Sequence, residues 1–202
     1  MTESKENIAM IRALADTVND YNSFIRYSGR LSTSYISKGK CHYGFIPSEN
    51  TVDIIRTLIH IRNKFPDEQP TPKFLDIGCG IGNIVQIAYR LGFEAYGLEY
   101  SEKIYNVAKE LTGQSPMSNV FKGDMLSFKK YHKYDVLYYY QPMSNVDVMS
   151  RFAKKLAREM KPGAYVIPVG TDLPFIESEI FKKSGSSKYI PHFRKSIISN
   201  KK

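Results

Sequence analysis

The spacing of apolar residues changes near residue 72. Before that point, apolar residues recur at helical spacing within two stretches, residues 5–26 and 48–64. A region rich in Ser, Gly, Lys and Tyr separates the two stretches. Ser48 is a suitable N-cap for the second stretch, and three prolines follow its end. The pattern therefore predicts an amphipathic N-terminal helix, a loop over 27–47 and a second helix.

After residue 72, short apolar runs alternate with helical stretches. The expected strands cover residues 73–77, 93–99, 120–121, 134–140 and 164–169, and the expected helices cover 84–91, 101–111 and 146–160. This alternation predicts βαβ units and a parallel sheet that is covered on both faces. Beyond it, residues 175–183 and 188–198 suit an antiparallel hairpin at the sheet edge, with a short helix over 175–183 as the alternative.

The most informative local motif follows the strand at 73–77, where three glycines alternate in Gly78-Cys79-Gly80-Ile81-Gly82. Glycine lets the backbone turn tightly and lets a ligand approach it, and the next helix presents free N–H groups. The spacing is not G-x-G-x-x-G, and Asp76 would lie poorly beside a pyrophosphate, which argues against a dinucleotide site. We expect Cys79 to fill space in this loop rather than act as a nucleophile.

The segment Leu75–Asn83 resembles motif I of the class I, seven-strand S-adenosylmethionine-dependent methyltransferases. The resemblance covers about residues 51–170 and continues in chain order through Gly97–Ser101, Gly123–Met125, Tyr134–Met143 and Lys161–Ala164. It implies a Rossmann-like, mostly parallel seven-stranded sheet with helices on both faces, a C-terminal antiparallel hairpin and an N-terminal helical cap. We expect the cap to cover residues 1–47 and the methyltransferase domain to cover 48–202.

The resemblance also implies S-adenosylmethionine as cofactor, S-adenosylhomocysteine as product, and a set of residues that hold them. The family's motif I acid and glycines surround the methionine and ribose portions, and Glu99 falls where an acid binds both ribose hydroxyls, because a carboxylate accepts two O–H bonds. Asp124 falls where an acid receives the adenine amino group, although Gly-Asp is also an ordinary turn. Tyr100 either stacks on adenine or simply begins a helix. The implied cofactor-binding residues are Tyr43, Asp76, Gly78, Gly80, Asn83, Glu99, Tyr100, Asp124 and Met125.

The loop after the fourth expected strand holds the candidate acceptor residues. Amino-methylating members of the family often carry Asx-Pro-Pro-aromatic there, whereas this chain has Tyr140-Gln141-Pro142-Met143. The departure argues against methylation of adenine or cytosine. It allows Gln141 to accept a hydrogen bond from an amine and Tyr140 to shape the pocket, because alignment can supply much of the catalysis. An ordinary Gln-Pro loop is the alternative.

The segment Tyr43–Ser48 resembles the non-SET protein-lysine methyltransferases, both the histone-lysine kind and a small mitochondrial kind. The glutamate that follows Tyr-Gly in the histone enzymes is absent, and Tyr138–Gln141 replaces their Asn-rich catalytic strand. This resemblance implies a protein amine as acceptor. Tyr35 and Tyr43 either close over the cofactor and exclude water or pack in the core.

Composition and charge narrow the function further. The 202 residues are 42% apolar and 24% charged, as in one soluble globular domain. The chain has a net charge of +9, and residues 151–202 carry most of it, with 12 basic and 4 acidic side chains. This quarter could bind nucleic acid or an acidic protein, or be a solvated face. No apolar run reaches the ~20 residues of a membrane span. The polar N-terminus shows no leader, and the Cys and His spacing shows no metal site, so we expect a metal-free cytoplasmic protein.

Together these features predict a methyltransferase that passes the methyl group by in-line displacement to an amine on a protein or a small molecule. An RNA or DNA methyltransferase that uses the basic C-terminal quarter is one alternative. A pseudo-enzyme that binds the cofactor and serves as a binding protein is another.

Overall fold

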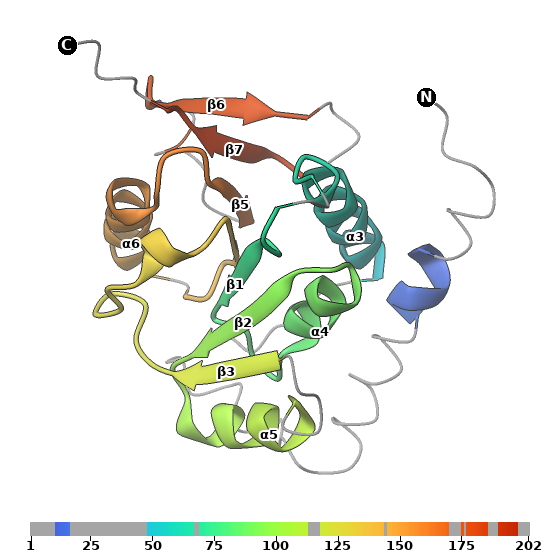
Figure 1. The fold of residues 1–202 in the computed structure, drawn as a ribbon. Coiled ribbons are helices and arrows are strands. Elements are labelled where there is room, and N and C mark those ends of the chain that lie inside the picture. The colour runs from blue at the N-terminus through green and yellow to red at the C-terminus, as the bar shows by residue number, and fades with distance from the viewer. Residues whose placement is uncertain are drawn as a thin grey trace.

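A seven-stranded sheet runs through the computed structural model in the order β3-β2-β1-β4-β5-β7-β6 (Figure 1). The structure describes residues 11–16, 48–66, 69–112, 118–143, 145–169, 175, 177–185 and 190–197. Its strands are β1 (Lys73–Ile77), β2 (Glu94–Glu99), β3 (Ser118–Lys122), β4 (Val136–Tyr140), β5 (Tyr165–Val169), β6 (Phe181–Ser184) and β7 (His192–Lys195). The pairs among β1 to β5 are parallel, whereas β7 pairs antiparallel with both β5 and β6.

Helices cover both faces of this sheet because its central strands are apolar on both sides. The helices are α3 (Ser48–Arg62), α4 (Asn83–Arg90), α5 (Glu102–Thr112) and α6 (Val146–Glu159), with a 3₁₀ turn η1 (Tyr131–Lys133). Phe74 of β1 and Tyr138 of β4 belong to the apolar cluster under α3 and α4. Leu75 and Tyr139 belong to the cluster under α6 and η1. Side chains that alternate along each strand thus fill two separate cores.

The predicted fold class is confirmed, down to the antiparallel hairpin at the C-terminal edge. Residues 181–184 form a strand and not a helix, and β7 lies between β5 and β6. Residues 11–16 are helical, and Ile11 and Ala15 pack into the core beside α3 and α4. The expected loop at 27–47 lies outside the described residues, and the division into a cap and a domain stays a prediction. None of the described helices is long and apolar enough to cross a membrane.

The parallel strands bring their carboxyl ends to one edge of the sheet. The glycine loop after β1, Tyr100 after β2, Gly123 after β3 and Gln141 after β4 therefore meet at this edge. Open parallel sheets bind ligands outside the carboxyl ends of their strands. The candidate site is found there.

Candidate functional site

The glycine loop that follows β1 is held against the end of β2. The N–H groups of Gly78 and Cys79 both donate to the Leu98 carbonyl, at 2.8 and 3.1 Å. Gly78, Gly80 and Gly82 have φ angles of +80°, +57° and +89°, a region that side chains with a Cβ rarely adopt. The alternate glycines are therefore required by the turn itself.

Glu99, at the end of β2, ties the loops after β1 and β2 together. One carboxylate oxygen accepts the Ser101 N–H at 2.7 Å and the other accepts the Gly80 N–H at 3.0 Å. Burial raises the pKa of Glu99, and backbone N–H donors, from Ser101, Gly80 and Tyr100, act against that rise. Each oxygen retains acceptor capacity, so the same carboxylate can also receive hydroxyl donors from a ligand.

Asp76 lies one residue before the end of β1 and is also buried, with 3% of its surface exposed. Burial, and then the nearby Glu99 carboxylate, raise the pKa of Asp76 well above its ordinary value. Two carboxyl groups that share a buried region disfavour ionisation of both. A ligand that brings positive charge to this region relieves that cost.

Cys79 occupies the inner side of the glycine loop and packs on β2. A Cβ built on Gly97 would lie only 2.6 Å from the Cys79 sulfur, so Gly97 makes room for this side chain. Burial, with the carboxyl groups of Asp76 and Glu99 nearby, raises the pKa of the Cys79 thiol well above its ordinary value. A buried thiol of this kind is a poor nucleophile, and Cys79 has the packing role expected from sequence.

A pocket of about 350 Å³ opens beside these loops. Ligand pockets for small molecules and cofactors commonly measure roughly 300–1,000 Å³ and are mostly apolar with a few polar groups. The pocket is lined by Gly78, Leu98, Tyr100, Gly123, Asp124, Met125, Leu126, Pro142, Met143 and Val148. Asp124 supplies the one carboxylate of this lining.

The turn that carries Asp124 and Met125 is rigidly supported. Asp124 Oδ1 accepts the Leu126 N–H at 2.9 Å, and the buried Tyr131 hydroxyl donates to the Met125 carbonyl at 2.7 Å. Tyr100 lines the same pocket with 65% of its surface exposed. An acid, a thioether and an aromatic ring thus surround a largely apolar hollow.

The structure brings together some predicted cofactor residues and places others behind them. Gly78, Tyr100, Asp124 and Met125 line the pocket, whereas Asp76, Gly80, Asn83 and Glu99 do not. Of this second group, the Gly80 N–H donates a hydrogen bond to the Glu99 carboxylate, and Asn83 is the first residue of α4. Tyr43, like Tyr35, lies outside the described residues. The roles of all nine stay predictions.

The two predicted acceptor residues lie next to the pocket without lining it. The Gln141 N–H donates to the Val169 carbonyl at 2.8 Å, and its side chain is exposed. Gln141 is the one non-glycine residue in the described ranges with a positive φ, +28°. Tyr140 is half-buried and packs against the α3 and α4 cluster. Such a strained backbone is found most often at functional loops.

Sequence reasoning missed six residues that line the pocket. They are Leu98, Gly123, Leu126, Pro142, Met143 and Val148. Four of them directly follow or precede a residue that was predicted, and Met143 lies two residues after the predicted Gln141. Val148 lies within the first turn of α6 and carried no signal, because only the packing of that helix brings it to the site.

Comparison with known proteins finds a methyltransferase family and several solved methyltransferase structures that resemble part of this chain. A family described as "Methyltransferase domain" matches residues 75–167. No protein with a curated description matches the chain. One similar solved structure is an S-adenosylmethionine-dependent methyltransferase from Mesorhizobium loti, 22% identical over 53% of this chain and 49% of that one, with a TM-score of 0.43. The chain thus spans about half the length of that protein.

Two further solved structures show a similar partial overlap. An RNA methyltransferase from Salinibacter ruber, in complex with S-adenosyl-L-homocysteine, is 20% identical over 56% of this chain and 71% of that one, with a TM-score of 0.45. An amino pentose methyltransferase from Micromonospora echinaspora is 21% identical over 56% and 47% of the two chains, with a TM-score of 0.46.

Proposed function

We propose that this chain, which belongs to the class I S-adenosylmethionine-dependent methyltransferases through its domain at residues 75–167, methylates an amine on a protein or a small molecule. The observation that carries the proposal is the Glu99 carboxylate, which joins the glycine loop to the end of β2 directly beside an apolar pocket. A lysine-type side chain is the protein acceptor that we favour.

The residues at this edge of the sheet fit the parts of S-adenosylmethionine. A Cβ on Gly78 would lie 2.6 Å from the Pro142 Cβ, so only glycine leaves this wall of the pocket as it is. Glu99 would receive the ribose hydroxyls, and Asp124 would receive the adenine amino group within the apolar hollow. The buried Asp76 would face the cationic part of the cofactor, where positive charge favours its ionised form.

The bound cofactor supplies an activated methyl group on a sulfonium centre, and the chain supplies alignment. We assign the orientation of the acceptor to the loop after β4. The Gln141 amide oxygen would accept a hydrogen bond from the amine and direct its lone pair, and Tyr140 would limit the space around it. Positioning of this kind lowers a displacement barrier without a strong general base.

Calorimetric titration with S-adenosylmethionine and S-adenosylhomocysteine tests the cofactor site. Glu99→Gln replaces one acceptor oxygen by an N–H₂ group that faces a backbone N–H, so we expect affinity to fall at least about tenfold. Glu102→Gln is the matched control, because Glu102 is exposed and pairs with Lys122 at 2.8 Å, away from the pocket. Absence of binding by the unmodified chain would refute the proposal.

Transfer of a labelled methyl group to fractionated lysate tests the acceptor. We expect label in protease-sensitive or low-mass fractions, and Gln141→Ala should reduce transfer while leaving S-adenosylhomocysteine binding unchanged. Label that is lost after nuclease treatment would instead identify the nucleic-acid alternative, which the basic C-terminal quarter favours. Tight cofactor binding with no transfer to any fraction would identify a pseudo-enzyme.

A further inference from the structure

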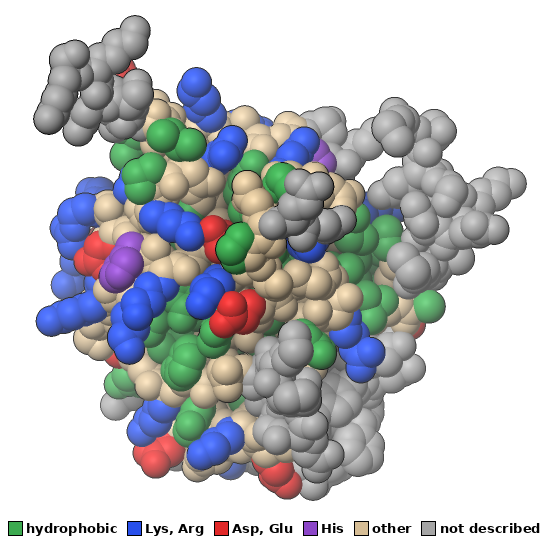
Figure 2. Space-filling model, viewed as in Figure 1, with side chains coloured by type: hydrophobic (Ala, Val, Ile, Leu, Met, Phe, Trp, Pro, Cys, Tyr) green, Lys and Arg blue, Asp and Glu red, His purple; other side chains and the backbone are tan. Residues whose placement is uncertain are grey.

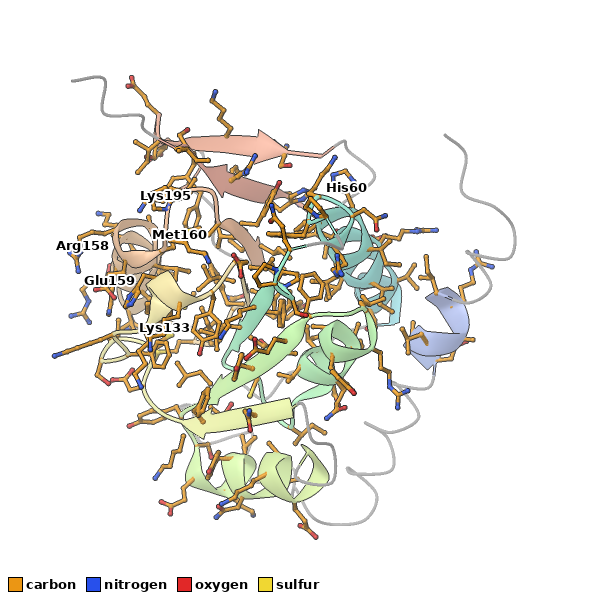
Figure 3. The ribbon with its side chains drawn as sticks, in the orientation of Figure 1. His60, Lys133, Arg158, Glu159, Met160 and Lys195 are labelled. Atoms are coloured by element: carbon orange, nitrogen blue, oxygen red, sulfur yellow. The ribbon has the colours of Figure 1, made fainter. Side chains whose placement is uncertain are left out.

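A second hollow, of about 580 Å³, lies between the segment after β3 and helix α6. It is lined by Ser127, Lys129, His132, Lys155, Arg158 and Glu159, and by Leu126, which also lines the cofactor pocket. Figure 2 shows Lys and Arg side chains gathered around a histidine on this flank, and Figure 3 places Lys133, Arg158 and Glu159 there. We name the hollow the basic groove.

The charges in the basic groove are strongly one-sided. Glu159 is the only acid among the lining residues, and it is paired with Lys155 at 2.5 Å and Arg158 at 3.2 Å. Lys155 also donates to the Phe128 carbonyl at 2.7 Å, so this network fixes one wall. The lining residue Lys129 is exposed, as are Lys130, Lys133 and Lys154 on the two segments that form the groove. The groove therefore presents a positive surface with its single acid already neutralised.

The groove lacks the features of a protein-binding surface. Protein interfaces are built around a buried apolar core that is rich in aromatic residues. Here Leu126 is the only apolar lining residue, and the nearby Tyr131 ring is buried beneath the Lys155 ammonium, 5.1 Å away. Phosphate oxygens, in contrast, are recognised by Lys, Arg and hydroxyl groups of the kind found here.

We propose that the basic groove binds nucleic acid through its phosphate backbone. The lining holds no Phe, Tyr or Trp ring, and its Lys, Arg and Ser side chains suit phosphate oxygens, so we expect binding to be independent of base sequence. The shared residue Leu126 puts one end of the bound strand beside the cofactor pocket. This binding needs neither the cofactor nor the methyl acceptor, so it goes beyond the proposed function.

Fluorescence anisotropy with a labelled single-stranded RNA of about 20 nucleotides tests the proposal, from about 50 to 200 mM KCl. The groove variant combines Lys129→Glu, Lys130→Glu and Lys133→Glu. We expect its affinity to fall at least about tenfold and its log–log salt slope to shrink by about two to three, one for each lost phosphate contact. The control variant carries the same charge change on other helices, with Arg90→Glu, Lys103→Glu and Lys109→Glu, and should keep the slope.

An equal loss of affinity in both variants would overturn the proposal, because net charge alone would then explain binding. Polyglutamate that displaces the RNA at equal charge concentration would also overturn it and assign the groove to acidic proteins. If the triple charge reversal impairs folding, the milder double variant Lys129→Gln with Lys133→Gln replaces it in the same RNA titration. S-adenosylhomocysteine titration of the same variants checks the fold, and RNA binding is scored without cofactor, so failure of one proposal is separable from failure of the other.

Discussion

The ring of Pro142 rests directly on the backbone of Gly78. A Cβ built on Gly78 would lie 2.6 Å from the Pro142 Cβ, a separation that real Cβ atoms essentially never show. This contact joins the loop after β1 to the loop after β4, and both residues line the pocket that we assign to the cofactor. The glycine thus serves the shape of the site as well as the turn.

Gly78→Ala should therefore damage both stability and cofactor binding. Alanine at a φ of +80° is strained by about 1–2 kcal/mol, and the clash with Pro142 adds to this cost by moving the pocket wall. We expect a loss of about 2–4 kcal/mol in urea unfolding and a marked loss of S-adenosylhomocysteine affinity. Urea titration and calorimetry of the same preparation measure the two effects.

Gly163→Ala separates the strain from the clash. Gly163 has a φ of +82°, and the nearest atoms to its added Cβ lie 3.6 Å away on Ile197, which is ordinary contact. The Gly163→Ala variant should be destabilised only by the backbone strain, about 1–2 kcal/mol, and should keep its affinity for S-adenosylhomocysteine. Equal losses in both variants would show that the Pro142 contact has no energetic role.

The sequence predicted the elements best where a local signal was strong. The predicted strand at 73–77 coincides with β1, because an apolar run before alternate glycines permits few alternatives. The strand predicted from residue 134 begins at 136, since Tyr131 and Tyr134 are buried in and beside the η1 turn rather than in the sheet. A run of buried aromatic residues gives the same sequence pattern whether it lies in a turn or in a strand.

The site was predictable only in its local parts. Gly78, Tyr100, Asp124 and Met125, which line the pocket, were singled out from motifs that each span only a few residues, and the roles predicted for Asp76 and Glu99 stay predictions. The Pro142 contact with Gly78, by contrast, depends on how the loop after β4 crosses the sheet edge. The basic groove likewise joins residues 127–132 to α6, so charge counted along the C-terminal quarter alone misses one of its walls.

Asp76→Asn should stabilise the protein at neutral pH while weakening cofactor binding. Burial, and then the nearby Glu99 carboxylate, raise the pKa of Asp76 in the folded state above its unfolded value. Protonated Asp76 therefore contributes fully to folding stability below the unfolded pKa, and this contribution is lost as the pH rises through the folded pKa. Each pKa unit corresponds to about 1.4 kcal/mol. Because Asn does not titrate, the stability difference between variant and parent should grow from pH 4 towards pH 8.

Urea unfolding across about pH 4 to 8 measures this difference. Glu102→Gln is the control, since the exposed Glu102 has its pKa lowered by Lys122 and should give no gain at neutral pH. An Asp76→Asn variant that is less stable than its parent at pH 7 would mean that the carboxylate is stabilised by the fold, contrary to the argument.

Tyr138→Phe and Tyr131→Phe should differ in their effect on stability although both rings are buried. Within the described part of the chain the Tyr138 hydroxyl is buried with no hydrogen-bond partner, whereas the Tyr131 hydroxyl donates to Met125 at 2.7 Å. We expect Tyr138→Phe to leave stability unchanged or raise it by about 1 kcal/mol, and Tyr131→Phe to lower it by about 1–2 kcal/mol. Thermal unfolding measures both, and a loss in Tyr138→Phe would show that its hydroxyl is bonded.

The Lys195 ammonium joins β7 to the C-terminal end of α6. Its Nζ donates to the carbonyls of Ala157, Arg158 and Met160, at 2.9, 3.1 and 2.7 Å, and Figure 3 shows the last two residues beside it. The last carbonyls of a helix have no partner within the helix, and a cation there also suits the helix dipole. Lys195, counted from sequence among the basic side chains of the C-terminal quarter, thus stabilises the fold through these hydrogen bonds.

Lys195→Met should remove this link while keeping the aliphatic stem. Charged hydrogen bonds contribute about 1.5–3 kcal/mol, so we expect a loss of that order in urea unfolding, with the C-terminal hairpin exchanging its amide protons faster. Lys182→Met on the outer strand β6 is the matched control, because Lys182 is exposed and should change stability by less than about 0.5 kcal/mol. Equal unfolding midpoints for the two variants would show that solvent satisfies the carbonyls of α6 as well as Lys195 does.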